Sequence, residues 1–191
     1  MIQFTPRTRE LDVRTLSTVA GTLLLLLIAG ATDARAQDLR RQGVFAGVGA
    51  GYGSFGCSNC GGRNSSPAGY VKVGFNLGPR VRQGLEASAW TKSEDGDRIT
   101  HGNLSIIVQV YPMTESGLFI KGGVGLSRLM VKDAVADETT SDAGLGFTGG
   151  LGFDIPVGGD FALSPYGSYQ WGDFDGGSAD HFQLGVGVTW R

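Results

Sequence analysis

Cys57 and Cys60 are separated by two residues, a spacing found in zinc sites, redox motifs and short disulfide loops. A zinc site needs four ligands, and the chain has no second pair of cysteines. A thioredoxin-type motif needs a βαβ setting, which the surrounding residues do not predict. In an exported protein a disulfide is the default for such a pair. We therefore expect a Cys57–Cys60 disulfide, with free thiols or a role as metal ligands as the alternatives.

The two histidines, His101 and His181, are the candidates for acid–base chemistry. A histidine can activate a serine hydroxyl as a nucleophile when a third group orients its ring. Ser105, Ser178 and Asp180 are the possible partners, but no recognisable motif joins them in the sequence. We therefore predict no catalytic residues.

The stretch Gly144–Gly149 matches the G-x-G-x-x-G pattern of dinucleotide-binding loops. That motif requires a helix after the glycines, because the helix N-terminus holds the phosphates. Gly150, Gly152 and Pro156 follow here, and these residues disfavour a helix. The glycines are therefore predicted to belong to a strand, and no cofactor is expected.

The composition excludes several classes of protein. Two of the 33 glycines precede residue 37 and the other 31 follow it. The glycine content of residues 37–191 is therefore far above the usual share of about 7 %. The net charge of −2 comes without a basic cluster, so nucleic acid is not expected as a partner. Because no stretch is uniformly apolar over about 18 residues, the sequence also argues against a helical membrane protein.

The first 36 residues have the order of a secretory signal peptide. Arg7, Arg9 and Arg14 precede an apolar run over residues 16–31, and Ala34-Arg35-Ala36 places small residues before Gln37. The apolar core is too short to span a membrane comfortably, which favours cleavage over an uncleaved anchor. We predict a signal peptide over residues 1–36 and one domain over residues 37–191.

Strict alternation of apolar with small or polar residues runs through that domain. Such a period of two indicates β-strands, because successive side chains point to opposite faces. None of the apolar positions is charged. Eight segments show the pattern, over residues 44–52, 69–77, 81–89, 104–110, 118–126, 145–153, 163–171 and 182–190.

The composition of the two faces indicates which of them lies outside. A soluble barrel would wet its polar face, and soluble surfaces are about 25–35 % charged. Here the polar face carries few charges and many glycines, which suit the narrow interior of a closed barrel. We therefore predict an all-β, eight-stranded antiparallel up-and-down transmembrane β-barrel whose apolar face meets lipid.

Aromatic residues and connections fit the same barrel. The aromatic residues of the apolar face fall near the two ends of the segments, as interfacial girdles do. The predicted connections also alternate in length, as periplasmic turns and outer loops do. The short ones cover residues 78–80, 112–117 and 156–160, and the longer ones cover residues 54–67, 91–98, 132–142 and 173–180.

Together these features resemble the small eight-stranded outer-membrane barrels of the OmpA-like and OmpX-like family. The resemblance covers residues 43–191 and rests on the leader, the strand count, stretches such as residues 118–125 and the last strand. That strand, Phe182–Trp190, looks like the signal read by the barrel-insertion machinery. The resemblance implies a monomer in the outer membrane of a Gram-negative-type bacterium, with outer-membrane lipid and that machinery as partners.

The family resemblance implies several functions. The leading expectation is a non-enzymatic barrel with a structural, adhesive or resistance role exercised through its outer loops. A small channel for ions or solutes is the alternative. Some barrels of this type modify lipid A with a histidine, and this enzymatic function is the third possibility.

Turn symmetry predicts which lumen residues meet. If the first short turn is symmetric about Pro79, Lys72 lies opposite Glu86 and Asn76 lies opposite Arg82. The same construction about Glu115 places Gln109 opposite Lys121.

The interior of an eight-stranded barrel is just wide enough to be filled by side chains. We therefore predict a Lys72–Glu86 pair and a polar core that blocks water flow, built around four residues: Lys72, Arg82, Glu86 and Lys121. In the alternative, these charges lie at wet ends of the lumen and interact weakly.

Overall fold

A computed structural model describes residues 43–58, 60–94, 96–113, 116–133 and 138–191, which lie in one compact unit, Arg40–Arg191. The predicted signal peptide, residues 1–36, lies outside the described residues. In the described part, no helix is long and apolar enough to cross a membrane. The strands are β1 (Val44–Cys57), β2 (Asn64–Asn76), β3 (Val81–Glu94), β4 (Asp97–Val110), β5 (Leu118–Asp133), β6 (Glu138–Phe153), β7 (Ile155–Gly158), β8 (Phe161–Phe174) and β9 (Gly177–Trp190).

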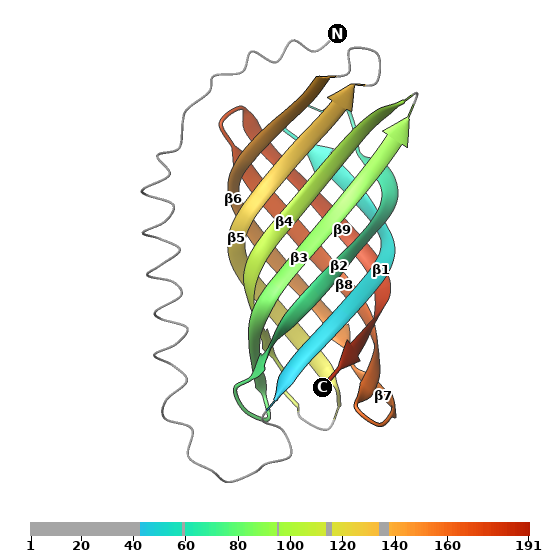
Figure 1. Cartoon of the computed structure of the whole chain (residues 1–191), viewed down its shortest axis with the longest axis vertical. Helices are drawn as coiled ribbons and strands as arrows, with labels where there is room; N and C mark the ends of the chain where they lie inside the picture. Colours follow the sequence, from blue (N-terminus) through green and yellow to red (C-terminus); the bar gives the residue numbers. More distant parts are fainter. Residues whose placement is uncertain (1–42, 59, 95, 114–115, 134–137) are drawn as a thin grey trace. The chain divides into compact units, whose positions relative to one another are not determined.

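Eight long strands form a closed antiparallel barrel (Figure 1). Neighbouring long strands pair in sequence order, β6 pairs with β8, and β9 returns to β1. The four-residue β7 pairs only with β8, inside the connection between β6 and β8. Each long strand pairs with a neighbour on both sides, as a sheet in lipid requires. The predicted eight-stranded, all-β fold is confirmed.

The strands extend further at one end of the barrel than the sequence predicts. This end, called the disulfide end here, holds the connections 58–63, 95–96, 134–137 and 175–176. The prediction of long loops at this end was wrong. Once the register of a hairpin is set, polar residues such as Thr139 continue the ladder between its two strands. Positive φ angles at Gly96 (93°) and Gly177 (138°) let two of these hairpins turn tightly. The opposite end, where β1 begins and β9 ends, is called the terminal end.

The two faces of the sheet lie as the alternation predicts. Apolar residues such as Val48, Leu85 and Leu184 are about half exposed on the outside, while Ser105 and Thr189 of the opposite face are buried. The predicted girdle residues are also outside, Tyr52 near one end and Phe75 near the other. Three large apolar side chains that the alternation places inward also fill the lumen: Phe45, Ile107 and Phe119.

Arginine at Val108 is expected to destabilise the barrel more than arginine at Val44. Both valines are 42 % exposed on the outer surface, but Val108 lies within β4 and Val44 begins β1 at the terminal end. An outward arginine costs about 2–4 kcal/mol at the membrane midplane and about 0–1 kcal/mol near an interface. Urea unfolding of Val108→Arg and Val44→Arg in lipid vesicles measures the difference. Equal losses would contradict the membrane placement of these two positions.

Candidate functional site

The lumen contains the four residues of the predicted polar core. The register pairs Lys72 with Glu86, Asn76 with Arg82, and Gln109 with Lys121, as the turn symmetry predicts. Four side chains of the predicted polar core are buried: Lys72, Arg82, Glu86 and Lys121. Gly47 and Gly150 leave room for the two lysines, since a Cβ at either glycine would lie 2.9 Å from a lysine Cε.

The ion pair in this core differs from the predicted one. Lys121 Nζ lies 2.5 and 2.6 Å from the two carboxylate oxygens of Glu86, and both side chains are at most 3 % exposed. Lys72, the register partner of Glu86, instead donates to Gln109 Oε1 at 3.2 Å. The predicted Lys72–Glu86 pair was therefore wrong: the lysine that bonds Glu86 comes from β5, two strands away.

A second buried cluster surrounds Asp154 at the terminal end. Its carboxylate accepts bonds from Ser164 Oγ at 2.6 Å and from Tyr111 Oη at 2.7 Å. It also pairs with Arg191 at 2.9 Å and with Arg82 at 3.3 Å. Arg82 therefore belongs to this cluster, where its guanidinium bonds Tyr111 and Asp154. Sequence reasoning missed Asp154 and Tyr111, which follow strand ends directly, although continuing the alternation by one step would have pointed both inward.

Hydrogen bonds connect the two clusters. Gln109 accepts from Lys72 and donates through Nε2 to Tyr111 Oη, which in turn donates to Asp154. The Tyr70 ring lies under both lysines, with Lys72 Nζ 5.3 Å and Lys121 Nζ 5.0 Å from its centroid. The contacts form a continuous charged layer across the part of the lumen nearer the terminal end, called the ion layer here.

The two histidines meet in the lumen near the disulfide end. His101 Nδ1 lies 2.8 Å from His181 Nδ1, and His101 Nε2 lies 2.9 Å from Ser127 Oγ. Both rings are fully buried. The serine beside His101 is thus none of the predicted candidates. Ser105 Oγ bonds Thr148 Oγ1, and the backbone N–H of Ser178 donates to Ser58 Oγ. Asp180, the predicted acid, pairs with Arg63.

An apolar cluster lies in the lumen beside the histidines. Phe55 stacks on Trp90 with ring centroids 4.8 Å apart, and the Trp90 indole donates to Gly53 O at 3.2 Å. Ala68 and Ala179 complete the buried cluster, and Phe174 packs against it. We call this cluster the lid. Sequence reasoning missed Phe55 and Trp90 because they lie at the limits of segments that were assigned to loops.

The surface of the disulfide end is tied together by a disulfide and an ion pair. Cys57 and Cys60 form the disulfide, with Cα atoms 5.1 Å apart. Arg63 donates to Asp180 Oδ2 at 2.6 Å and to Ser54 O at 2.7 Å, joining the β1–β2 connection to β9. The hydrogen bond that Arg63 donates to Asp180 raises the pKa of Arg63 above its usual value. In the described ranges, no three His, Cys, Asp or Glu residues come together to form a metal site.

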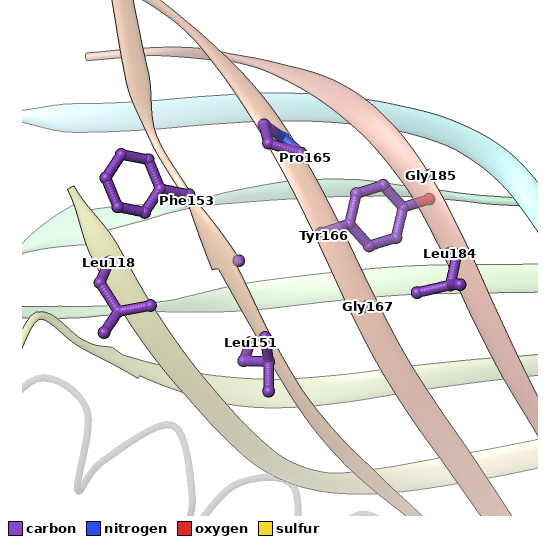
Figure 2. A pocket seen from close by; sticks show the side chains of 9 residues that line it. Leu118, Leu151, Phe153, Pro165, Tyr166, Gly167, Leu184 and Gly185 are labelled. Atoms are coloured by element: carbon purple, nitrogen blue, oxygen red, sulfur yellow. The ribbon is translucent and has the colours of Figure 1, made fainter.

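A shallow hollow of about 430 Å³ lies on the outer surface between β5, β6, β8 and β9. In Figure 2, Leu118, Leu151 and Phe153 line one side and Leu184 lies on the other. Pro165 lacks an N–H, and the β6–β8 ladder ends beside it, at Gly152–Tyr166. The hollow is apolar and lies on the face predicted to meet lipid. It therefore adds no polar group to the candidate site.

The comparisons with known proteins agree with this architecture. The model for the outer membrane protein beta-barrel domain matches residues 22–189. Neisserial surface protein A is 17 % identical with a TM-score of 0.56, and the match covers 78 % of this chain and 96 % of that one. Ail, the attachment invasion locus protein of Yersinia pestis, is 12 % identical with a TM-score of 0.55, over 78 % and 99 %. No curated protein matches the sequence. The chain belongs to the family of outer membrane protein beta-barrel domains.

Proposed function

We propose that this chain is a non-conducting, non-enzymatic outer-membrane barrel whose role is structural or adhesive and is exercised at the disulfide end. The observation that carries the proposal is that buried side chains fill the lumen at two depths, in the ion layer and in the lid. Eight strands leave an interior that side chains can fill. Two closures at different depths argue against the alternative of a small channel.

The contacts within each closure explain why the lumen stays shut. In the ion layer, the Glu86–Lys121 pair is buried, and separating buried charges leaves each of them uncompensated. In the lid, Phe55 and Trp90 are at most 3 % exposed and stack on each other. Opening a path for water would require both closures to rearrange.

The surface of the disulfide end is rigid, which favours the binding of a partner. Its described hairpins are short, the Cys57–Cys60 disulfide closes one of them, and the Arg63–Asp180 pair fixes that connection to β9. A surface that is ordered before binding loses less conformational entropy when a partner docks. Ail is named for attachment and invasion, and its likeness to this chain is one of fold.

The proposal predicts that the wild-type protein gives no steady conductance in planar lipid bilayers. A variant lacking only the lid stacking, Trp90→Ala, should stay silent because the ion layer remains. The combination of Trp90→Ala with Glu86→Ala and Lys121→Ala should conduct. Tyr52→Ala is the control, since Tyr52 is 60 % exposed on the outer surface. Gel mobility before and after boiling checks that each variant is folded.

Steady conductance of the folded wild type would overturn the proposal and favour the channel. Two further measurements separate the remaining roles. Adhesion counts and detergent sensitivity of bacteria with and without the chain distinguish an adhesive role from a structural one. Mass spectrometry of lipid A from the same cells tests the enzymatic alternative, and a change in lipid A that depends on His101 would contradict a non-enzymatic role.

A further inference from the structure

The buried charges of the lumen do not balance. Apart from the histidines, the charged side chains that are buried among the described residues are Lys72, Arg82, Glu86, Lys121 and Asp154. Three of them are cations and two are carboxylates, which leaves one positive charge in excess. A charge removed from water is costly unless it is paired, so this excess charge requires a compensating group.

The cation in excess is Lys72, because each buried carboxylate already has a cationic partner. Both oxygens of Glu86 accept from Lys121, and Asp154 pairs with Arg82. The hydrogen bond of Lys72 goes to a neutral group, Gln109 Oε1, at 3.2 Å. Within the described ranges, no carboxylate bonds the Lys72 ammonium, and the residue is 4 % exposed.

The aromatic residues around Lys72 favour its charged form. Lys72 Nζ lies 5.3 Å from the ring centroid of Tyr70 and 5.3 Å from that of Phe119. The face of an aromatic ring attracts a cation, although it adds no negative charge. An ammonium has three N–H groups, and Gln109 accepts from one of them, so the other two can donate to a further acceptor.

The hydroxyl of Tyr70 is a second donor close to this ammonium. Tyr70 is 4 % exposed, and among the described residues its Oη has no hydrogen-bond partner. A buried hydroxyl without a partner is costly, which points to a ligand that accepts from it. One acceptor can serve two donors that lie up to about 6 Å apart, twice the length of a hydrogen bond. The position of Lys72 Nζ above the Tyr70 ring allows this.

The charge and the surroundings of Lys72 define the kind of acceptor. One unmatched positive charge requires one negative charge. The space is narrow, because Tyr70 and Phe119 belong to a buried aromatic cluster and a Cβ at Gly47 would lie 2.9 Å from Lys72 Cε. A halide is small and monovalent, whereas phosphate is larger and carries more charge. Arg191, with a side chain that is 36 % exposed at the terminal end, can attract anions from solution.

We propose that the ion layer binds one chloride ion, which accepts hydrogen bonds from the Lys72 ammonium and the Tyr70 hydroxyl. The chloride neutralises the positive charge that the buried carboxylates leave unmatched. This site goes beyond the proposed function, because a halide held inside the lumen neither requires nor excludes a role at the disulfide end.

Chloride-35 NMR of the refolded mature protein in a neutral detergent tests the site, because exchange with bound chloride broadens the signal. Lys72→Met should abolish the broadening that the lumen site causes. Tyr70→Phe should bind chloride roughly tenfold more weakly, which corresponds to one hydrogen bond to a charged group. Lys92→Met is the matched control, since Lys92 lies in β3 at the disulfide end and pairs with Glu94 at 2.6 Å. This control should broaden the signal like wild type.

Urea unfolding measures the same site through its effect on stability. At constant ionic strength, replacing gluconate with chloride at ten times its Kd should raise the folding equilibrium constant of wild type roughly tenfold. Lys72→Met should show no such rise. Without chloride, this variant should be at least as stable as wild type, because the unmatched buried charge is gone.

Further outcomes decide whether the site and its ligand are correct. Bromide should displace chloride, and displacement by inorganic phosphate but not by bromide would overturn the assignment of a halide. An equal chloride response in wild type and Lys72→Met, or an equal loss in Lys92→Met, would overturn the proposal. Wild-type affinity in Tyr70→Phe would overturn the hydroxyl as second donor. Should Lys72→Met not fold, a wild-type stability that is independent of chloride overturns the proposal and indicates that Lys72 is buried as a neutral amine.

Discussion

Glu86→Leu is expected to destabilise the folded barrel by about 3–5 kcal/mol, because it leaves the buried ammonium of Lys121 without its partner. Lys121 Nζ lies within 2.6 Å of both Glu86 oxygens, and its side chain is 3 % exposed. The free energy of urea unfolding in lipid vesicles measures the loss.

A double-mutant cycle separates this pair from simple loss of packing. Lys121→Met alone should destabilise the barrel to a similar degree, and the double variant should recover a large part of either loss. The matched cycle uses Lys72→Met with Glu86→Leu. Lys72 donates to Gln109, so its coupling to Glu86 should be smaller than that of Lys121. Additive effects in both cycles would show that Glu86 does not depend on Lys121.

Asp154→Asn is the second substitution with a large expected effect, also about 3–5 kcal/mol of unfolding free energy. The Asp154 carboxylate is 1 % exposed and pairs with both Arg82 and Arg191. Asparagine keeps the shape but removes the only negative charge that the described contacts give these two arginines. The arginines would then repel each other with nothing between them.

The control for Asp154→Asn is Asp180→Asn, measured by the same urea unfolding. Asp180 also pairs with an arginine, Arg63, but the side chains are 20 % and 47 % exposed. Exposed ion pairs contribute about 0–1 kcal/mol, so this variant should remain close to wild type in stability. A small loss for Asp154→Asn, similar to that of Asp180→Asn, would show that the Asp154 cluster does not stabilise the terminal end.

Much of the barrel could be read from the sequence because its information is local. The face of each strand residue depends on its own parity along the strand, so the alternation placed Val108 outside and Gln109 inside. Short symmetric turns link neighbouring strands, so the pairing of Lys72 with Glu86 also follows from positions close in the chain. A membrane barrel cannot leave edges unpaired, which turns eight such segments into a closed sheet.

Contacts across the lumen depend on closure and were set only by the tertiary structure. Glu86 bonds Lys121 because long side chains can reach past their register neighbours. His101 and His181 are 80 residues apart and meet only because β9 returns to β1. The tertiary structure also decided the lengths of the strands at the disulfide end. A ladder continues through polar residues as long as the two strands stay in register. Local alternation thus determined which residues face the lumen, and the closed barrel decided which of them touch.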